Sequence, residues 1–259
     1  MAGFSLCSFI LYGGAFFLYH RRMDNGAFKN QKFTTGKFIV IEGTDGSGKG
    51  TQTKFLAEKL KSLGVAFELA DFPQYDEPSG YFAAKYLRGE YGSAEDVGPY
   101  RGSIFYAVDR YEKSFDIRRW LAEGKVVISN RYVSASMGHQ AGKIQNKAKR
   151  EKFLKWLTLL EYGIFDIPKP NLTILLYVPP AIGQKFVDQK VARAYTKGEK
   201  RDIHEADLEH LQAAAKAYLE VAKKNKWTVI DYRTTKGGIL SLEEVQAKIW
   251  DRVEKLLKI

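Results

Sequence analysis

A nine-residue segment, residues 43–51, has the composition of a phosphate-binding loop. It reads Gly-Thr-Asp-Gly-Ser-Gly-Lys-Gly-Thr, and its lysine is Lys49. Glycines allow several backbone N–H groups to turn towards one anion. The lysine ammonium adds a full positive charge that suits the β- and γ-phosphates of a nucleotide. The segment therefore predicts a P-loop, a motif that binds the phosphates of a nucleotide.

The flanking sequence supplies the strand and the helix that a P-loop requires. Residues 38–41 form an apolar, β-branched run, and apolar residues recur at helical spacing from Phe55 to Leu63, before Gly64. A helix that begins at the loop directs its partial positive charge at a bound phosphate. The alternative is a glycine-rich connection without a ligand, but spacing and context both favour phosphate binding.

Apolar strand patterns alternate with helical patterns along the rest of the chain. Further strands are predicted at residues 65–70, 126–129, 172–178 and 227–230. Further helices are predicted at residues 79–87, 99–120, 134–140, 147–161, 182–191, 206–224 and 242–257. This alternation predicts right-handed crossovers and a parallel sheet covered on both faces. The predicted fold class is α/β, a P-loop NTPase-type three-layer α/β/α domain with a five-stranded parallel sheet, whose ligands bind at the carboxyl ends of the strands.

Length and composition suit one such domain with a lid. The chain has 259 residues and a formal net charge of +11. That surplus suits anionic partners, namely nucleotides, nucleic acid or acidic lipid, without choosing between them. The single cysteine, Cys7, excludes an intramolecular disulfide and a cysteine zinc cluster, and it favours a reducing, cytoplasmic compartment.

Residues 1–36 are expected to form an N-terminal extension outside the fold, which is predicted to occupy residues 37–259. Residues 4–19 are almost wholly apolar, but a membrane span needs about 20 apolar residues. They also lack the basic n-region of a secretory signal. Translation from Met23 or a disordered tail is the favoured interpretation, and a membrane partner is expected only if residues 4–19 are a genuine anchor.

Four segments spread over the predicted domain form a recognisable set. They are residues 42–49 (EGTDGSGK), 72–73 (FP), 105–110 (FYAVDR), and 130–132 (NRY) with 138–142 (GHQAG). Beyond the P-loop each segment alone is weak. Together they resemble the nucleoside monophosphate kinases and most closely the thymidylate kinases, over residue 37 to about the C-terminus. The resemblance implies an ATP-dependent transfer of the γ-phosphoryl group to dTMP, which gives dTDP and ADP.

The resemblance also implies a donor site and an acceptor site. ATP is expected to contact Gly43, Thr44, Asp45, Gly46, Ser47, Gly48, Lys49, Gly50 and Thr51. The acceptor is expected to contact Phe72, Tyr106, Arg110, Arg131, His139 and Gln140. In this family the residue at Asp45 bonds the 3′-hydroxyl of the sugar, the aromatic ring at Tyr106 stacks on thymine, and the arginine at Arg131 touches the acceptor phosphate.

Each of these side chains also has a purely structural interpretation. Asp45 could form a turn, Tyr106 could pack in the core, and Arg131 could pair with an acidic residue. A lone histidine such as His139 is more often structural than functional. The ligand-binding interpretation has physical support. Helical spacing places Tyr106 and Arg110 on one face of a helix, where both could contact one ligand. A flat ring suits a pyrimidine, and a strand-end arginine needs an anionic partner.

A basic segment at about residues 191–203 resembles the short lid of these kinases. Its cationic candidates are Arg193, Lys197, Lys200 and Arg201. One version of the family stabilises the transferring phosphoryl group with a P-loop arginine, and the other version uses lid arginines. The P-loop here contains no arginine, so the lid version is implied. The implied catalytic residues are Lys49, Asp45, Arg131, Arg193 and Arg201; a solvated basic loop is the alternative for the lid.

Two positions depart from the family pattern. Gly50 and Thr51 follow the lysine, as in adenylate kinases, and Gly50 offers no hydroxyl to a metal. Asn130 stands where thymidylate kinases usually have aspartate, and an amide is a poorer magnesium partner than a carboxylate. Mg²⁺ is therefore expected to be held by the ATP phosphates and by waters, with no direct protein ligand and with Asn130 in the outer shell.

Two other functions stay open. A kinase for another nucleoside monophosphate is favoured by Gly50 and Thr51 but opposed by Asp45 and the Tyr106–Arg110 pair. A non-catalytic P-loop protein that binds nucleotides or nucleic acid is permitted by the basic lid and the net charge, although nucleic acid is not the expected partner. The resemblance further implies a homodimer formed through the long helices, including residues 99–120.

Overall fold

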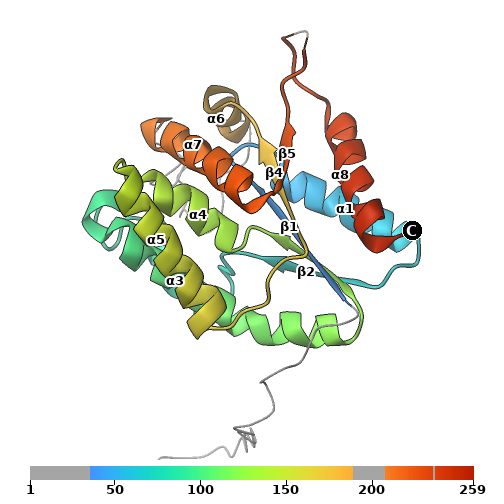
Figure 1. Cartoon of the computed structure of the whole chain (residues 1–259), viewed down its shortest axis with the longest axis horizontal. Helices are drawn as coiled ribbons and strands as arrows, with labels where there is room; N and C mark the ends of the chain where they lie inside the picture. Colours follow the sequence, from blue (N-terminus) through green and yellow to red (C-terminus); the bar gives the residue numbers. More distant parts are fainter. Residues whose placement is uncertain (1–35, 189–207, 236) are drawn as a thin grey trace, which may run out of the picture. The chain divides into compact units, whose positions relative to one another are not determined.

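The computed structural model describes residues 36–188, 208–235 and 237–259 (Figure 1). Contacts divide the chain into two units, Met1–Lys32 and Phe33–Ile259, and only the second contains described residues. The predicted lid and all of the predicted N-terminal extension except Gly36 lie outside the described residues. Gly36 itself donates its N–H to the carbonyl of Leu121.

Five parallel strands form one sheet, as the sequence predicts. They are β1 (Lys37–Gly43), β2 (Phe67–Asp71), β3 (Val126–Asn130), β4 (Leu172–Tyr177) and β5 (Thr228–Asp231). Their order across the sheet is β2-β3-β1-β4-β5. The first strand is thus central, and the loop that follows it opens at the middle of the carboxyl edge. A strand order that reverses beside β1 is the usual place for a ligand in such sheets.

Helices flank the sheet, and most follow the predicted pattern. They are α1 (Lys49–Ser62), α2 (Tyr81–Leu87), α3 (Ala94–Ala122), α4 (Val133–Gly142), α5 (Lys147–Leu159), α6 (Pro180–Asp188), α7 (Leu208–Asn225) and α8 (Leu242–Leu257). A short 3₁₀ helix (Pro78–Gly80) precedes α2 and a π-helical turn (Leu160–Ile164) follows α5. Helix α3 starts before the predicted Pro99 because Gly98, at φ 70° and ψ 169°, joins a first turn to the longer helix. Pro99 then opens that longer part, a position that tolerates its missing N–H.

The alternating side chains of β1 face two hydrophobic cores. Phe38 and Val40 belong to the core that α3, α4, α5 and α7 cover. Ile39 and Ile41 belong to the core that α1 and α8 cover. Figure 1 shows these two helical layers on opposite sides of the sheet. The three-layer arrangement predicted from the sequence is therefore confirmed. Within the described residues, no helix has the length and apolar character to cross a bilayer.

Helix α4 packs very closely on α7 through two glycines. A Cβ atom added to Gly142 would lie 2.8 Å from the backbone nitrogen of Ala214. A Cβ atom added to Gly138 would overlap the ring of Tyr218. Only glycine allows this approach, which fixes the position of α4 beside the carboxyl edge of the sheet.

We expect Gly142→Ala to lower the free energy of unfolding by about 1–3 kcal/mol, because the new methyl group meets backbone that cannot rotate away. Urea denaturation measures the change. Gly50→Ala is the matched control: its methyl group would meet no atom of the described residues within 4 Å, and an alanine within a helix is favourable by up to about 1 kcal/mol. Equal stability of Gly142→Ala and the parent protein would contradict the close-packing argument.

Candidate active site

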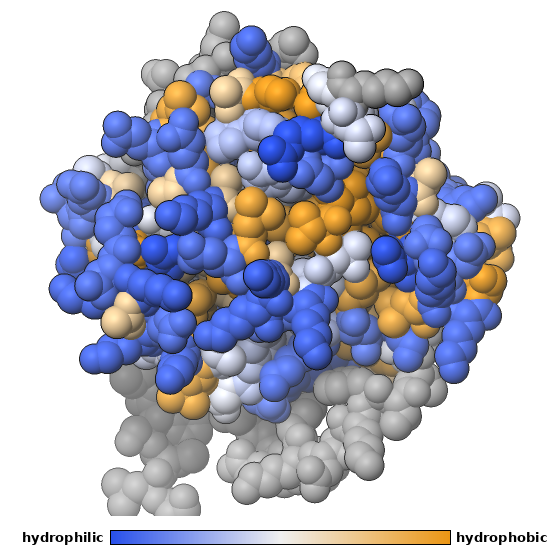
Figure 2. All heavy atoms as spheres, turned by 45° about the horizontal axis from the view of Figure 1, so that its top comes forward, coloured by the Kyte–Doolittle hydropathy of each residue, from blue (hydrophilic) through white to orange (hydrophobic). Residues whose placement is uncertain are grey.

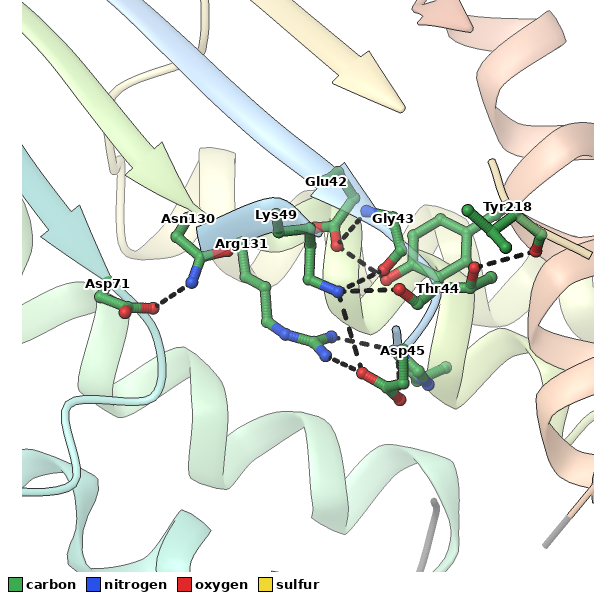
Figure 3. Close-up of polar contacts among 11 residues, drawn as sticks. Glu42, Gly43, Thr44, Asp45, Lys49, Asp71, Asn130, Arg131 and Tyr218 are labelled. Atoms are coloured by element: carbon green, nitrogen blue, oxygen red, sulfur yellow. Dashed lines mark hydrogen bonds and ion pairs between the residues drawn. The ribbon is translucent and has the colours of Figure 1, made fainter. Parts of the chain in front are cut away.

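The carboxyl ends of three strands meet at one level and carry the polar cluster of Figure 3. Asn130 at the end of β3 pairs in register with Asp71 on β2 and with Ile41 on β1. The glycine loop continues from β1, and Arg131 continues from β3. The sheet register therefore brings the loop and the strand-end arginine to the same edge. Figure 2 turns the top of Figure 1 forward and shows hydrophilic side chains around a central apolar area.

The glycine loop has the backbone geometry that its composition predicts. Gly46 and Gly48 have positive φ angles of 78° and 75°, a conformation that glycine adopts without strain. Gly48 is also the N-cap of α1. A Cβ atom on Gly46 would overlap the backbone of Gly183 in α6, so main chain lies directly on main chain there. The loop needs glycine at position 46 both for its conformation and for this contact.

Lys49 lies beneath the loop and is only 8% exposed. Its Nζ donates hydrogen bonds to the carbonyl oxygens of Gly43 at 3.0 Å and Thr44 at 2.9 Å. The same Nζ is 3.8 Å from Oδ1 of Asp45. The first turn of α1 thus holds the Lys49 ammonium against the loop, as the sequence predicts for a P-loop lysine.

Asp45 forms an ion pair with Arg131, which approaches from β3 (Figure 3). Burial lowers the pKa of the Arg131 guanidinium, but the Asp45 and Glu42 carboxylates outweigh burial and raise that pKa well above its usual value. Arg131 therefore stays charged. Its φ of 66° is unusual for a residue other than glycine. An acidic partner is the structural alternative foreseen for Arg131, whereas the alternative foreseen for Asp45 was a turn.

His139 contacts the other side of the same guanidinium. Its Nε2 is 3.1 Å from Nη1 of Arg131, and burial lowers the pKa of the imidazole well below its usual value. An arginine only donates, so Nε2 of a neutral His139 accepts, and the ring proton is assigned to Nδ1. The ring also stacks on His210, with centroids 5.8 Å apart. His139 therefore orients Arg131 from α4.

Glu42 is a buried carboxylate to which the sequence assigned no role. Its oxygens accept hydrogen bonds from the hydroxyl of Ser134 at 2.8 Å, the hydroxyl of Tyr218 at 2.9 Å and the N–H of Gly43 at 3.0 Å. It joins the end of β1 to α4 and α7. An acidic residue between an apolar strand and a glycine loop was the available signal, but its partners are distant in sequence.

Arg110 is buried in an ion pair with Glu161, which the sequence did not predict. Its Nε donates to Oε2 of Glu161 at 2.9 Å, and its Nη2 donates to Oγ of Ser136 at 3.1 Å. Burial lowers the pKa of Arg110, but Glu161 outweighs burial and raises it above its usual value. Most of the donors of this guanidinium are thus already engaged within the protein.

The remaining predicted acceptor residues lie on or beside α3 and α4. Phe72 is 3% exposed and packs in the core against Tyr132, with ring centroids 5.7 Å apart. Tyr106 is half-buried and lies edge-on to Tyr86. Gln140 is 1% exposed, and its Oε1 has no hydrogen-bond partner among the described residues. Ligand contact by these residues stays a prediction. Arg193 and Arg201 lie outside the described residues.

A glycine loop between β1 and α1, with a buried lysine and a parallel sheet of this order, defines a P-loop nucleotide-binding protein. A model of the thymidylate kinase family matches residues 41–249. The chain belongs to the thymidylate kinase family, whose members are phosphotransferases. This membership confirms the resemblance that the four sequence segments indicated.

Individual relatives are similar over most of their length. The chain is 29% identical to thymidylate kinase of Mycobacterium tuberculosis over 197 residues, which cover 74% of this chain and 90% of that protein. It is 30% identical to a probable thymidylate kinase of Methanococcoides burtonii over 199 residues, covering 76% and 88%. A solved structure of thymidylate kinase from Candida albicans has the same fold, with a TM-score of 0.65, 24% identity, and 86% and 92% coverage.

Removing the charge of Glu161 should strongly destabilise the fold. We expect Glu161→Gln to lower the free energy of unfolding by about 3–5 kcal/mol, because it leaves the buried Arg110 without its counter-charge. The double variant Arg110→Met/Glu161→Leu should recover much of that loss. The exposed pair of Asp231 and Arg233 provides the control, since Asp231→Asn should cost at most about 1 kcal/mol. Urea unfolding of all four proteins gives the comparison, and a small loss for Glu161→Gln would contradict the buried-pair argument.

Proposed function

We propose that this protein transfers the γ-phosphoryl group of ATP to dTMP and gives ADP and dTDP. The observation that carries the proposal is the cluster of Lys49, Asp45 and Arg131 beside the glycine loop, in a chain of the thymidylate kinase family. Transfer between two nucleotides needs cations that hold both phosphates in line and neutralise their charge. Lys49 and Arg131 supply cations from two different elements at one edge.

On the donor side, residues 43–51 bind the ATP phosphates through backbone N–H groups and through the N-terminus of α1. The ammonium of Lys49 rests on the carbonyl oxygens of Gly43 and Thr44. These neutral acceptors are weaker partners than an anion. In the proposed complex, Lys49 exchanges them for the β- and γ-phosphates.

On the acceptor side, dTMP replaces the ion pair that closes the site. The dTMP phosphate forms an ion pair with Arg131 in place of Asp45. The 3′-hydroxyl of dTMP then donates a hydrogen bond to the Asp45 carboxylate. His139 keeps the guanidinium oriented through its neutral Nε2. Tyr106 and Phe72 provide ring contacts for thymine. The buried Oε1 of Gln140, which no described residue donates to, accepts a hydrogen bond from the ligand. Arg110, held by Glu161, is also assigned to the acceptor side.

No covalent enzyme intermediate and no general base are needed. The nucleophile is an oxygen of the dTMP phosphate, and a phosphate monoester is mostly ionised at neutral pH. Catalysis consists of alignment and charge neutralisation by Lys49 and Arg131, with Arg193 and Arg201 of the proposed lid adding charge and excluding water. Asp45 contributes by orienting the acceptor sugar.

Mg²⁺ brought in with ATP would supply further charge neutralisation in the proposed reaction. The residues at the strand ends fit an outer-shell role, because the buried amide oxygen of Asn130 has no hydrogen-bond partner among the described residues and hard cations and their waters prefer oxygen. Asn130 would hold a metal-bound water rather than the ion itself.

The same proposal assigns the remaining parts of the chain. Residues 37–259 form the catalytic domain, with a lid at about residues 191–203, and residues 1–36 are an extension. The single cysteine, Cys7, is consistent with work in the reducing cytoplasm.

Coupled-enzyme detection of ADP tests the function directly. We expect turnover with dTMP and much weaker turnover with dUMP, dCMP or AMP. Lys49→Met should reduce kcat by on the order of 10²–10³-fold, because the charge for the donor phosphates is lost. Lys54→Met changes an exposed lysine on the same helix and should leave kcat unchanged. A preference for another monophosphate would identify a different acceptor. No ADP release with any acceptor, together with salt-sensitive DNA binding, would reject the kinase proposal.

We also propose that the protein forms a homodimer through α3. Four apolar side chains recur along one face of this helix, and each is at least 40% exposed: Tyr100, Ile104, Val108 and Tyr111. Leu159 and Ile164, near the end of α5, are also well exposed. Tyr100 contacts Trp156 of α5, with ring centroids 4.7 Å apart, so this helix pair presents one apolar surface. Such a stripe marks a protein contact rather than a solvated face.

Placing a charge in this stripe should break the dimer. We expect sedimentation analysis to show a dimer for the parent protein and a folded monomer for Ile104→Glu/Val108→Glu, since two buried carboxylates cannot be solvated in an apolar interface. Leu63→Glu introduces one carboxylate at an exposed apolar residue after α1 and should leave the dimer intact. A monomeric parent protein, or a charged variant that still dimerises, would contradict the proposed interface.

A further inference from the structure

The carboxyl ends of β2 and β3 hold an acid–amide pair beside the phosphate loop. Asp71 and Asn130 are register partners in the sheet. The Nδ2 of Asn130 donates to Oδ1 of Asp71 at 2.9 Å. In Figure 3 Asn130 lies between Asp71 and the cluster of Lys49, Arg131 and Asp45. The pair therefore adjoins the proposed phosphate-transfer site, and the proposed roles of residues 45, 49 and 131 do not use it.

The carboxylate determines which way the amide faces. An ionised carboxylate only accepts hydrogen bonds, so Asn130 must present its NH₂ group to Asp71. Its Oδ1 then faces away from Asp71, is buried, and has no hydrogen-bond partner among the described residues. A buried carbonyl oxygen without a donor costs about 1–3 kcal/mol. The arrangement thus maintains an oriented acceptor that is ready for a donor from a ligand.

The pair also explains the amide at position 130. A carboxylate there would face Asp71 at hydrogen-bond distance, and two carboxylates so close cannot both ionise. The strand ends therefore carry one negative charge, and it resides on β2. Burial raises the pKa of Asp71, while Asn130, Arg131 and Lys49 each act to lower it. Asp71 thus interacts electrostatically with both cations of the site.

We propose that Asp71 is a positioning residue for the metal-bound water of Mg·nucleotide: it fixes Asn130 so that Oδ1 accepts a hydrogen bond from that water. The inference rests on the proposed function, in which Mg²⁺ arrives with ATP. A water on a divalent cation is a strong donor and suits an acceptor backed by a negative charge. Asp71 on β2 supplies this charge, and its hydrogen bond to Asn130 on β3 orients the amide oxygen towards the water.

Moving the charge from one strand to the other tests the proposal. The variants are Asp71→Asn, Asn130→Asp and the swap Asp71→Asn/Asn130→Asp. The probe is Mn²⁺, titrated by electron paramagnetic resonance into the protein with ADP bound, so the measurement needs no turnover. We expect Asp71→Asn to weaken Mn²⁺ binding by about 10–100-fold, the usual effect of losing an outer-shell partner. The swap should regain most of that loss.

Four comparisons separate positioning from structural damage. ADP affinity without metal should be unchanged in every variant, and circular dichroism checks folding. Asp251→Asn removes an equivalent exposed carboxylate on α8 and should bind Mn²⁺ like the parent protein. Asn130→Leu keeps Asp71 but removes the relay, so it should weaken Mn²⁺ binding as Asp71→Asn does. If Asp71→Asn does not fold, Asn130→Leu still decides, because its Mn²⁺ affinity is compared directly with that of the parent protein.

Two outcomes would overturn the inference. One is a folded Asp71→Asn or Asn130→Leu variant that binds Mn²⁺ as tightly as the parent protein. The other is a folded swap that binds Mn²⁺ no better than Asp71→Asn. Failure of the proposed function gives a different result, because the parent protein would then bind Mn²⁺ with ADP but phosphorylate no dTMP.

Discussion

The site depends on one carboxylate that balances two cations. Lys49 comes from α1 and Arg131 from the end of β3, and both approach Asp45. Holding the buried Lys49 beside the half-buried Arg131 without a counter-charge would be costly. The carboxylate therefore stabilises the site before any nucleotide binds, and the same positive charges suit the phosphates of two nucleotides. The charges of Lys49, Arg131 and Asp45 therefore determine both the stability of the site and its proposed affinity for the ligands.

A second set of contacts holds this cluster from behind. Glu42 ties the end of β1 to Ser134 on α4 and to Tyr218 on α7. The close glycine contact between α4 and α7 keeps those partners within reach, and His139 on α4 then orients Arg131. The position of the Arg131 side chain thus depends on the packing of α4 and α7 on one face of the sheet. Rigid elements of this kind can keep a reacting group in place while its partners change on ligand binding.

The sequence predicts local features well and distant pairings poorly. The P-loop, the five strands and the bounds of α8 follow from composition, from short apolar runs and from helical spacing, which neighbouring residues determine. The Arg110–Glu161 pair could not be predicted, because it joins α3 to a π-helical turn that only the folded chain brings near. The contact of Asp71 with Asn130 depends on sheet register, which the sequence of either strand alone does not contain. The sequence therefore identifies the charged residues, whereas only the structure shows which residues they pair with.

The main-chain contact between the P-loop and α6 limits how this protein can vary. Gly46 lies in the loop and Gly183 in α6, and a Cβ atom on either would overlap backbone of the other segment. A change at one position cannot be compensated by shrinking the other, since neither has a side chain to lose. Neither glycine can therefore be replaced by a larger residue. Gly183 should be as intolerant of replacement as a residue that touches the nucleotide. Mutational sensitivity in this fold thus reaches from the P-loop to Gly183 in α6, for reasons of space rather than of chemistry.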